Sequence, residues 1–168
     1  MIAPLVPQTV LPDGPERGRQ AGGREVTVEV VVANRKIAHS FPPEIRDLYE
    51  AWVEFEALDA SGGSVFHSGF LEADGRLDPS AHVYRQVLLD HAGQPITRHE
   101  VWLAALKAYD NAIPAGRSDV VRFRFTWPTD PAGSFARLTL RARVNYRRFN
   151  EDYSDFVRLE TARTVPGS

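Results

Sequence analysis

The segments VRFRFTW (residues 121–127) and ARLTLRARVNY (residues 136–146) decide the fold class, because hydrophobic and polar residues alternate along both. In the first segment the odd-numbered residues are mostly hydrophobic, and in the second the even-numbered residues are mostly hydrophobic. A helix would scatter these sets around its circumference, whereas a strand places each set on one face. Both segments are therefore predicted to be strands with one buried face.

The rest of the chain carries five more strand-like segments separated by turns rich in Gly, Pro and Asp. With the two above extended to 118–127 and 135–147, the predicted strands are 24–34, 50–58, 64–70, 81–90, 100–109, 118–127 and 135–147. Residues 44–57 also fit helical spacing, and Thr97 with Glu100 matches a capping box. We favour a strand at 50–58 and at most a short helical turn at 43–48.

Strands at such spacing predict an all-β, immunoglobulin-like antiparallel β-sandwich of about seven to nine strands, with at most short helical turns. We expect an extended or mobile lead-in at residues 1–23, because this segment is rich in Pro, Gly and Arg. The β-sandwich domain is predicted at 24–160 and a C-terminal tail at 161–168.

Composition limits the classes of partner. The chain has 168 residues, 43% of them hydrophobic, which suits one globular domain with a sizeable core. Its formal charge of -2 lacks the basic excess of a nucleic-acid binder, so no nucleic-acid partner is expected. No stretch is long and apolar enough to span a bilayer, and no signal peptide is visible; if the protein is exported, its signal was removed or lies in a parent sequence.

The chain contains no cysteine. This excludes disulfides, a thiol nucleophile, a thiolate zinc site and covalent attachment of a c-type haem to this chain. We also find no nucleophile elbow and no Gly-rich phosphate loop, and we therefore expect no enzymatic activity.

The segment NRKIAHSFPP (residues 34–43) follows the valine-rich strand predicted at 24–34. Pro42 and Pro43 prevent further ladder pairing, so His39 is expected on a stiff loop at the end of a strand. An imidazole in such a position is suited to bind a metal or a cofactor; the alternative is that His39 caps the end of the strand or lies in solvent.

Several segments together give the chain a family resemblance. They are IAHSFPPEIRD (37–47), EAWVEFEALDASGGSVFHSG (50–69), DPSAHVYRQVLLDHAGQPI (78–96), YDNAIPAGRSDVVRFRF (109–125) and LRARVNYRRFN (140–150). In their order and spacing they resemble the non-haem β-rich domain of multihaem c-type cytochromes, including those fused to tetratricopeptide repeats. The resemblance covers roughly residues 24–157 and includes a His-x-Phe-Pro motif at His39.

The resemblance implies a non-catalytic accessory domain in a multihaem cytochrome electron-transfer system, in the periplasm or outside the cell. It implies that His39 is a distal axial ligand, with Phe41 and the two prolines as an apolar wall. Because the chain has no Cys-x-x-Cys-His motif, the haem c would be carried by another segment of the same parent protein or by a neighbouring chain. The alternative is a stand-alone exported module that binds protein or glycan; a signal peptide on an isolated reading frame would favour it.

His82 is the second candidate cofactor-binding residue. It either ligates or flanks a cofactor, or donates a hydrogen bond to a backbone carbonyl inside the sandwich. His67, His91 and His99 are weaker candidates, and the five histidines show no close metal-ligand spacing.

Acidic turns leave a metal site open. Asp74, Gly75 and Asp78, with Asp59, either offer oxygen ligands to calcium or act as ordinary turn formers. The sequence therefore leaves the metal unknown.

Overall fold

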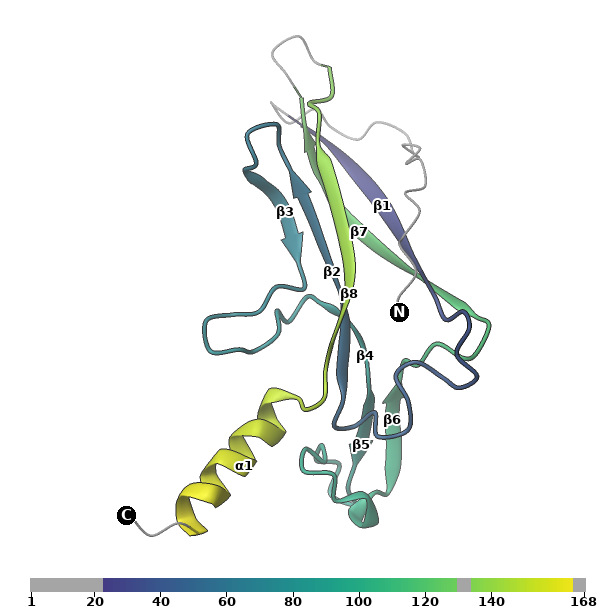
Figure 1. Ribbon diagram of the computed structural model, residues 1–168, viewed down its shortest axis with the longest axis vertical. Helices are drawn as coiled ribbons and strands as arrows, with labels where there is room; N and C mark the ends of the chain where they lie inside the picture. The colour runs from purple at the N-terminus through teal and green to yellow at the C-terminus, as the bar shows by residue number, and fades with distance from the viewer. Residues whose placement is uncertain (1–22, 130–133, 165–168) are drawn as a thin grey trace.

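The computed structural model describes residues 23–129 and 134–164, and this part of the chain is mostly β-structure (Figure 1). The strands are β1 (Gly23–Ala33), β2 (Glu50–Leu58), β3 (Ser64–Ser68), β4 (His82–Tyr84), β5 (Gln86–Leu89), β6 (Leu106–Asp110), β7 (Ser118–Pro128) and β8 (Thr139–Arg147). A 3₁₀ helix η1 (Val101–Leu103) precedes β6, and an α-helix α1 (Glu151–Thr164) follows β8. The fold class predicted from the sequence, a mostly antiparallel β-sandwich, is confirmed.

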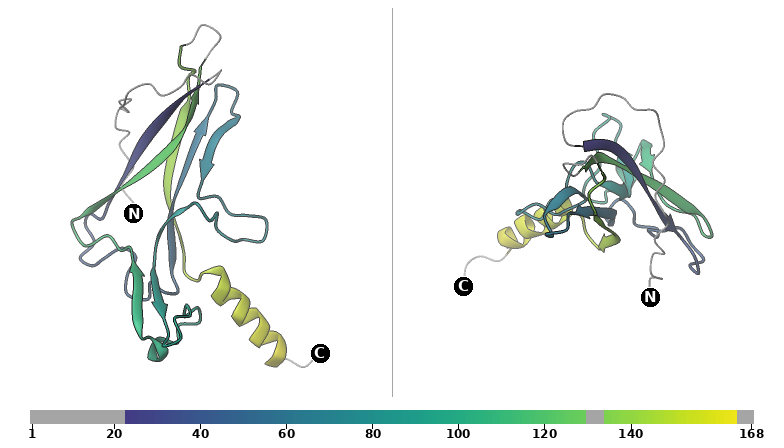
Figure 2. Two further views of the ribbon diagram at one scale, coloured as in Figure 1. Left: turned by 180° about the vertical axis from the view of Figure 1, so that it is seen from behind. Right: turned by 90° about the horizontal axis from the view of Figure 1, so that it is seen from above.

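The strands form two layers and a smaller ribbon. In one layer β1 pairs with β7 over its whole length, and in the other β2 pairs with β8 along one edge and with β3 and β4 along the other. The third sheet is the β5–β6 ribbon, which extends beyond the two layers (Figures 1 and 2). All of these pairings are antiparallel.

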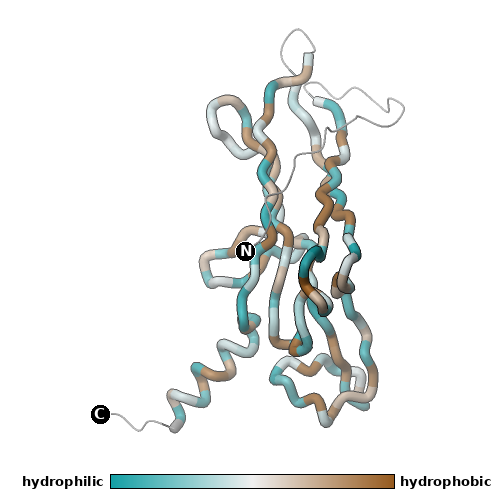
Figure 3. Tube along the Cα trace, turned by 45° about the vertical axis from the view of Figure 1, so that its right-hand side comes forward, coloured by the Kyte–Doolittle hydropathy of each residue, from teal (hydrophilic) through white to brown (hydrophobic). Residues whose placement is uncertain are grey.

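The hydrophobic core lies between the two layers. Alternate residues of β1 and β7 point inward, and Figure 3 shows the corresponding alternation of hydropathy along the strands. Phe55 of β2 stacks on Phe123 of β7 with ring centroids 4.6 Å apart. The buried members of this core are Val26, Val28, Val30, Val32, Ala51, Val53, Phe55, Ala57, Tyr84, Ile113, Val121, Phe123 and Phe125.

Four predicted strands differ from the observed ones by two residues or more, and one of them, predicted at 135–147, begins only at Thr139. The strand predicted at 64–70 ends at Ser68, because Gly69 adopts a φ of +80°. The strand predicted at 81–90 is divided at Arg85, where the chain leaves the sheet of β2 and joins β6. The strand predicted at 100–109 begins as η1 and becomes β6 only at Leu106. The residue before η1 is Glu100 and no side chain caps the turn, so Thr97 and Glu100 do not form the capping box that their spacing suggests.

The prediction of at most short helical turns is wrong for the C-terminus, where α1 has 14 residues. Asn150 caps this helix, since its side-chain oxygen accepts a hydrogen bond of 2.9 Å from the Tyr153 amide. Acidic residues in the first turn and Arg163 in the last complement the helix dipole. The predicted tail at 161–168 is thus helical as far as Thr164, and residues 165–168, like most of the lead-in at 1–23, lie outside the described residues.

Candidate functional site

The loop that carries His39 begins where β1 ends. The Asn34 side chain is buried, and its Nδ2 donates hydrogen bonds of 2.9 Å to the carbonyl oxygens of His39 and Ile113. Phe41 and Ile113 also exchange backbone hydrogen bonds of 2.9 and 2.8 Å. The His39 loop is therefore tied on both sides to the segment that precedes β7.

The ring of His39 has one nitrogen engaged. Nδ1 lies 2.8 Å from the carbonyl oxygen of Ser40, and because a carbonyl can only accept, Nδ1 carries the proton. The neutral ring then has its lone pair on Nε2. Histidines that bind metals commonly donate the second nitrogen to a backbone carbonyl in this way, which fixes the tautomer and the ring orientation. His39 is exposed, so Nε2 is accessible to a ligand from outside the chain.

The residues after His39 pack against the hydrophobic core. Pro42 is fully buried, and Phe41 packs edge-on against Tyr84 with ring centroids 6.0 Å apart. Pro42 therefore cannot wall a cofactor, whereas Phe41 and Pro43 are half-buried and their part in such a wall stays a prediction. Their burial anchors the loop, whereas the exposed hydrophobic residue next to the histidine is Ile37.

His82 lies on β4 and connects the two layers. Its Nε2 is 2.8 Å from Asp119 Oδ2 at the start of β7, and Tyr84 donates its hydroxyl to the same carboxylate oxygen at 3.1 Å. Asn111 lies 3.2 Å from the same ring nitrogen and donates to the Val83 carbonyl. The hydrogen-bond partner of His82 is thus a carboxylate, and not the backbone carbonyl expected if His82 had a structural role. Binding of iron through Nε2 would require the ring to leave Asp119.

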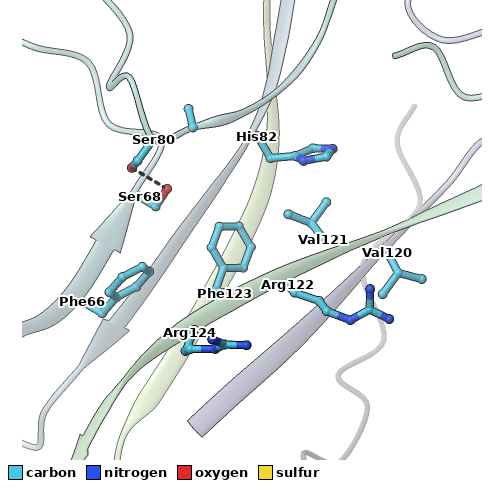
Figure 4. Close-up of a pocket in the computed structure, with 10 residues that line it drawn as sticks. Phe66, Ser68, Ser80, His82, Val120, Val121, Arg122, Phe123 and Arg124 are labelled. Atoms are coloured by element: carbon cyan, nitrogen blue, oxygen red, sulfur yellow. Dashed lines mark hydrogen bonds between the residues drawn. The ribbon is translucent and has the colours of Figure 1, made fainter. Parts of the chain in front are cut away.

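His82 also lines a cavity of about 460 Å³ between the β3–β4 edge and β7 (Figure 4). Ser68 and Ser80 lie on one side of this cavity, and Arg122 and Arg124 lie on the other. The Ser80 hydroxyl donates to Asp78 Oδ2 at 2.8 Å and lies 3.4 Å from the Ser68 hydroxyl. The hydrogen bond of this serine is therefore made to a carboxylate and not to the neighbouring imidazole.

The burial of Tyr84 affects its ionisation. Its pKa is raised strongly, mainly because the phenol is removed from water and also because it faces the charge of Asp119. The phenol consequently stays protonated and acts as a hydrogen-bond donor within the cluster formed by His82, Tyr84, Asn111 and Asp119.

Two of the remaining histidines are paired with carboxylates. His67 Nε2 lies 3.2 Å from Glu54 Oε1, and His99 Nδ1 lies 2.6 Å from Asp47 Oδ2. His91 lies exposed in the turn after β5. Of the described histidines, His39 is the one that combines an exposed ring with a proton fixed by a backbone carbonyl.

The acidic residues considered for calcium act within their own turns. Asp59 accepts hydrogen bonds from the amides of Ser61 and Gly63, and Asp78 accepts from the amides of Gly69 and Ser80. Asp74 accepts from the Arg76 amide at 3.0 Å. Within residues 23–129 and 134–164, no group of three or more His, Cys, Asp or Glu side chains is arranged to hold a metal ion.

Sequence reasoning identified His39 but missed the residues that support it. Asn34 belongs to the quoted motif, and an asparagine directly after a strand is the signal that could have marked it as a loop clamp. Asp119 has no such signal, because its partners His82 and Tyr84 are 37 and 35 residues away in sequence.

Comparison with known proteins gives no matching family model and no matching curated protein. A similar solved structure is the penta-heme cytochrome c552 from Thermochromatium tepidum, with a TM-score of 0.56 and 18% sequence identity. The similarity covers 80% of this chain and 32% of the cytochrome chain, so this chain spans about a third of that protein's length. The chain therefore shares its fold with part of a multihaem cytochrome.

Within the described residues, no helix is both long and hydrophobic enough to span a membrane.

Proposed function

We propose that this chain is a non-catalytic accessory domain of a multihaem c-type cytochrome system, in which His39 is the distal axial ligand of a haem carried elsewhere. The observation that carries this proposal is the hydrogen bond from His39 Nδ1 to the Ser40 carbonyl, which leaves an accessible lone pair on Nε2. A haem would supply reversible one-electron chemistry at its iron. The part of this chain is to present a nitrogen ligand and to hold it in one orientation.

The loop architecture supports this role. Asn34 fixes the His39 carbonyl, and the Phe41–Ile113 pair fixes the chain two residues further on. A ligand held on rigid elements keeps its orientation with little loss of conformational entropy on binding. His82 is a weaker ligand in this proposal, because Asp119 already occupies its Nε2.

The partner follows from the fold and from the absence of cysteine. The similar structure is a penta-heme cytochrome, of which this chain matches a third or less. We therefore infer that the haem-bearing partner is a multihaem c-type cytochrome, either in the same parent protein or as a neighbouring chain. With such a partner, we infer that the protein acts in the periplasm or outside the cell.

The proposal can be tested with a haem c peptide that keeps its Cys-x-x-Cys-His segment and has one open axial position. Titration of the peptide with the full chain is expected to produce the absorption spectrum of iron with two histidine ligands. His39→Ala should abolish that change. His91→Ala is the matched control, because it removes an equally exposed imidazole from a turn and should leave the spectrum of the complex unchanged.

Two outcomes would overturn the proposal. One is a wild-type chain that leaves the spectrum of the haem peptide unaltered. The other is a change of spectrum that persists in His39→Ala, which would assign the ligand to another residue. In the latter case His82→Ala identifies whether the second candidate is responsible.

A further inference from the structure

Three basic residues lie next to His39 on the loops that Asn34 connects. Arg35 and Lys36 precede the histidine, and Arg117 is brought beside them because its carbonyl accepts the Asn34 amide at 2.9 Å. The Gly116 amide donates to the Asn34 carbonyl at 2.9 Å, so the two loops run side by side. All three basic side chains are exposed. We call Arg35, Lys36 and Arg117 the basic loop cluster.

This cluster differs from most other cations of the molecule. Arg122 and Arg124 pair with glutamates across β1, and Arg141, Arg143 and Arg147 pair with glutamates across β2. Within the described ranges 23–129 and 134–164, no carboxylate lies in ion-pair distance of a member of the basic loop cluster. In a chain whose formal charge is -2, these three positive charges lie on two adjacent loops and have no ion pair within the described residues.

The backbone conformation of Lys36 is unusual for a lysine. Lys36 has a φ of 66°, in the left-handed region that glycine adopts at lower cost. The residue is one of only two lysines in the chain. The flexible ammonium group of Lys36 thus belongs to the turn between β1 and His39. The exposed Ile37 lies between Lys36 and His39 in the sequence.

We propose that the basic loop cluster binds the propionate carboxylates of the haem that His39 ligates; this inference rests on the proposed function. A haem combines an apolar ring with two carboxylates at one edge, and the loop combines an exposed hydrophobic residue and an imidazole with three uncompensated cations. Guanidinium and ammonium groups are the side chains that bind carboxylates through charge-assisted hydrogen bonds. The cluster therefore orients the haem edge while His39 holds the iron.

The test uses the full chain and the same haem c peptide, in its native form and with its carboxylates esterified. Arg35→Gln/Lys36→Gln/Arg117→Gln should weaken binding of the native peptide about tenfold, as expected for three exposed charge pairs. The variant should still produce the two-histidine spectrum at saturation. Added salt should weaken wild-type binding more than binding by the variant.

The matched control is Arg124→Gln/Arg141→Gln/Arg163→Gln, which removes the same charge from exposed positions away from the loop. It should bind the native peptide like the wild type, and the esterified peptide should bind all three proteins with similar affinity. Equal loss of affinity in both triple variants would reduce the effect to net charge and overturn the inference. Unchanged affinity in the loop variant, with ligation by His39 intact, would overturn the inference and leave the proposed function standing. Failure of the wild type to coordinate the iron would overturn both.

Discussion

Asn34 offers the sharpest test of how the His39 loop is built. Its side chain is only 3% exposed, and its Nδ2 donates two hydrogen bonds, one to the His39 carbonyl and one to the Ile113 carbonyl. Asn34→Ala removes both donated hydrogen bonds; the Ile113 carbonyl keeps its bond from the Phe41 amide, whereas the His39 carbonyl loses its bond from Asn34. The substitution therefore acts on the loop without touching the imidazole itself.

The expected cost can be worked from these two bonds. Each hydrogen bond contributes roughly 0.5–1.5 kcal/mol, so the loss of two should lower the free energy of unfolding by about 1–3 kcal/mol. With a urea slope of about 2 kcal/mol per molar, the unfolding midpoint should move down by about 1 M. Asn34→Asp should cost at least as much, since it places a carboxylate against two carbonyl oxygens.

The assay is equilibrium unfolding in urea followed by tryptophan fluorescence. Arg35→Ala is the control, because this neighbouring side chain is exposed and its removal should change stability by no more than about 0.5 kcal/mol. Asn34→Ala should also bind the haem c peptide more weakly than the wild type while keeping the two-histidine spectrum. An Asn34→Ala protein that unfolds at the wild-type urea concentration would refute the clamp.

Three further predictions concern the scaffold. Gly69→Ala should destabilise the fold by about 2–4 kcal/mol in urea unfolding, because Gly69 has a φ of +80° and an added Cβ would overlap the Val53 carbonyl oxygen; a loss below about 1 kcal/mol would contradict this. Tyr84 should ionise only when the protein unfolds, since burial and the charge of Asp119 raise its pKa. In an ultraviolet titration, Tyr84→Phe should remove the step that coincides with alkaline unfolding. Ionisation of Tyr84 in the folded protein would contradict this. Asp78 is buried, which alone would raise its pKa, but hydrogen bonds starting with the Gly69 amide lower the pKa below the usual 3.8. Its stabilising effect is thus present above pH 3.8 and lost as the pH falls through the lowered pKa. Asp78→Asn should therefore lose stability at pH 7 and approach the wild type as the pH falls through that lowered pKa, and a constant difference would refute the assignment.

The strands that could be predicted from the sequence are those whose pattern reflects burial on one face. The prediction for β2 matches the observed Glu50–Leu58, where Phe55 packs on Phe123 and Phe125 across the core. The break at Arg85 was not predictable in the same way. There the chain changes partners from β2 to β6, and a change of partner leaves no mark on the hydrophobic period.

The helix α1 was missed for a different reason. Its stability comes from the Asn150 cap and from ion pairs such as Arg158–Glu151, at 2.6 Å, more than from a continuous hydrophobic stripe. Leu159 is 61% exposed, so the helix does not show the buried face that a pattern search detects. The capping asparagine and the acidic first turn were visible in the sequence, but this segment was assigned to the end of the β-sandwich domain and to the C-terminal tail.

The candidate site likewise has one feature that the local sequence determines and others that depend on the tertiary structure. A strand-end histidine before two prolines could be found from the sequence, because the prolines act locally on the backbone. The tautomer of His39 depends on the backbone angles that bring the Ser40 carbonyl to its ring, and the clamp depends on Ile113, which is 79 residues from Asn34. Such features require the tertiary structure.

The exposure of His39 determines what kind of complex this chain can form. A histidine that binds iron within its own chain is usually enclosed by that chain, whereas His39 is exposed, with its supporting Asn34 and Phe41 directed into the body of the protein. If the proposed function holds, the apolar contacts that hold a porphyrin must come mostly from the partner, while this chain would contribute the ligating nitrogen and the charges of the basic loop cluster. Binding to an isolated haem peptide should consequently be weaker than binding to the complete cytochrome, since the peptide offers the ligand and the carboxylates but not the protein surface around them.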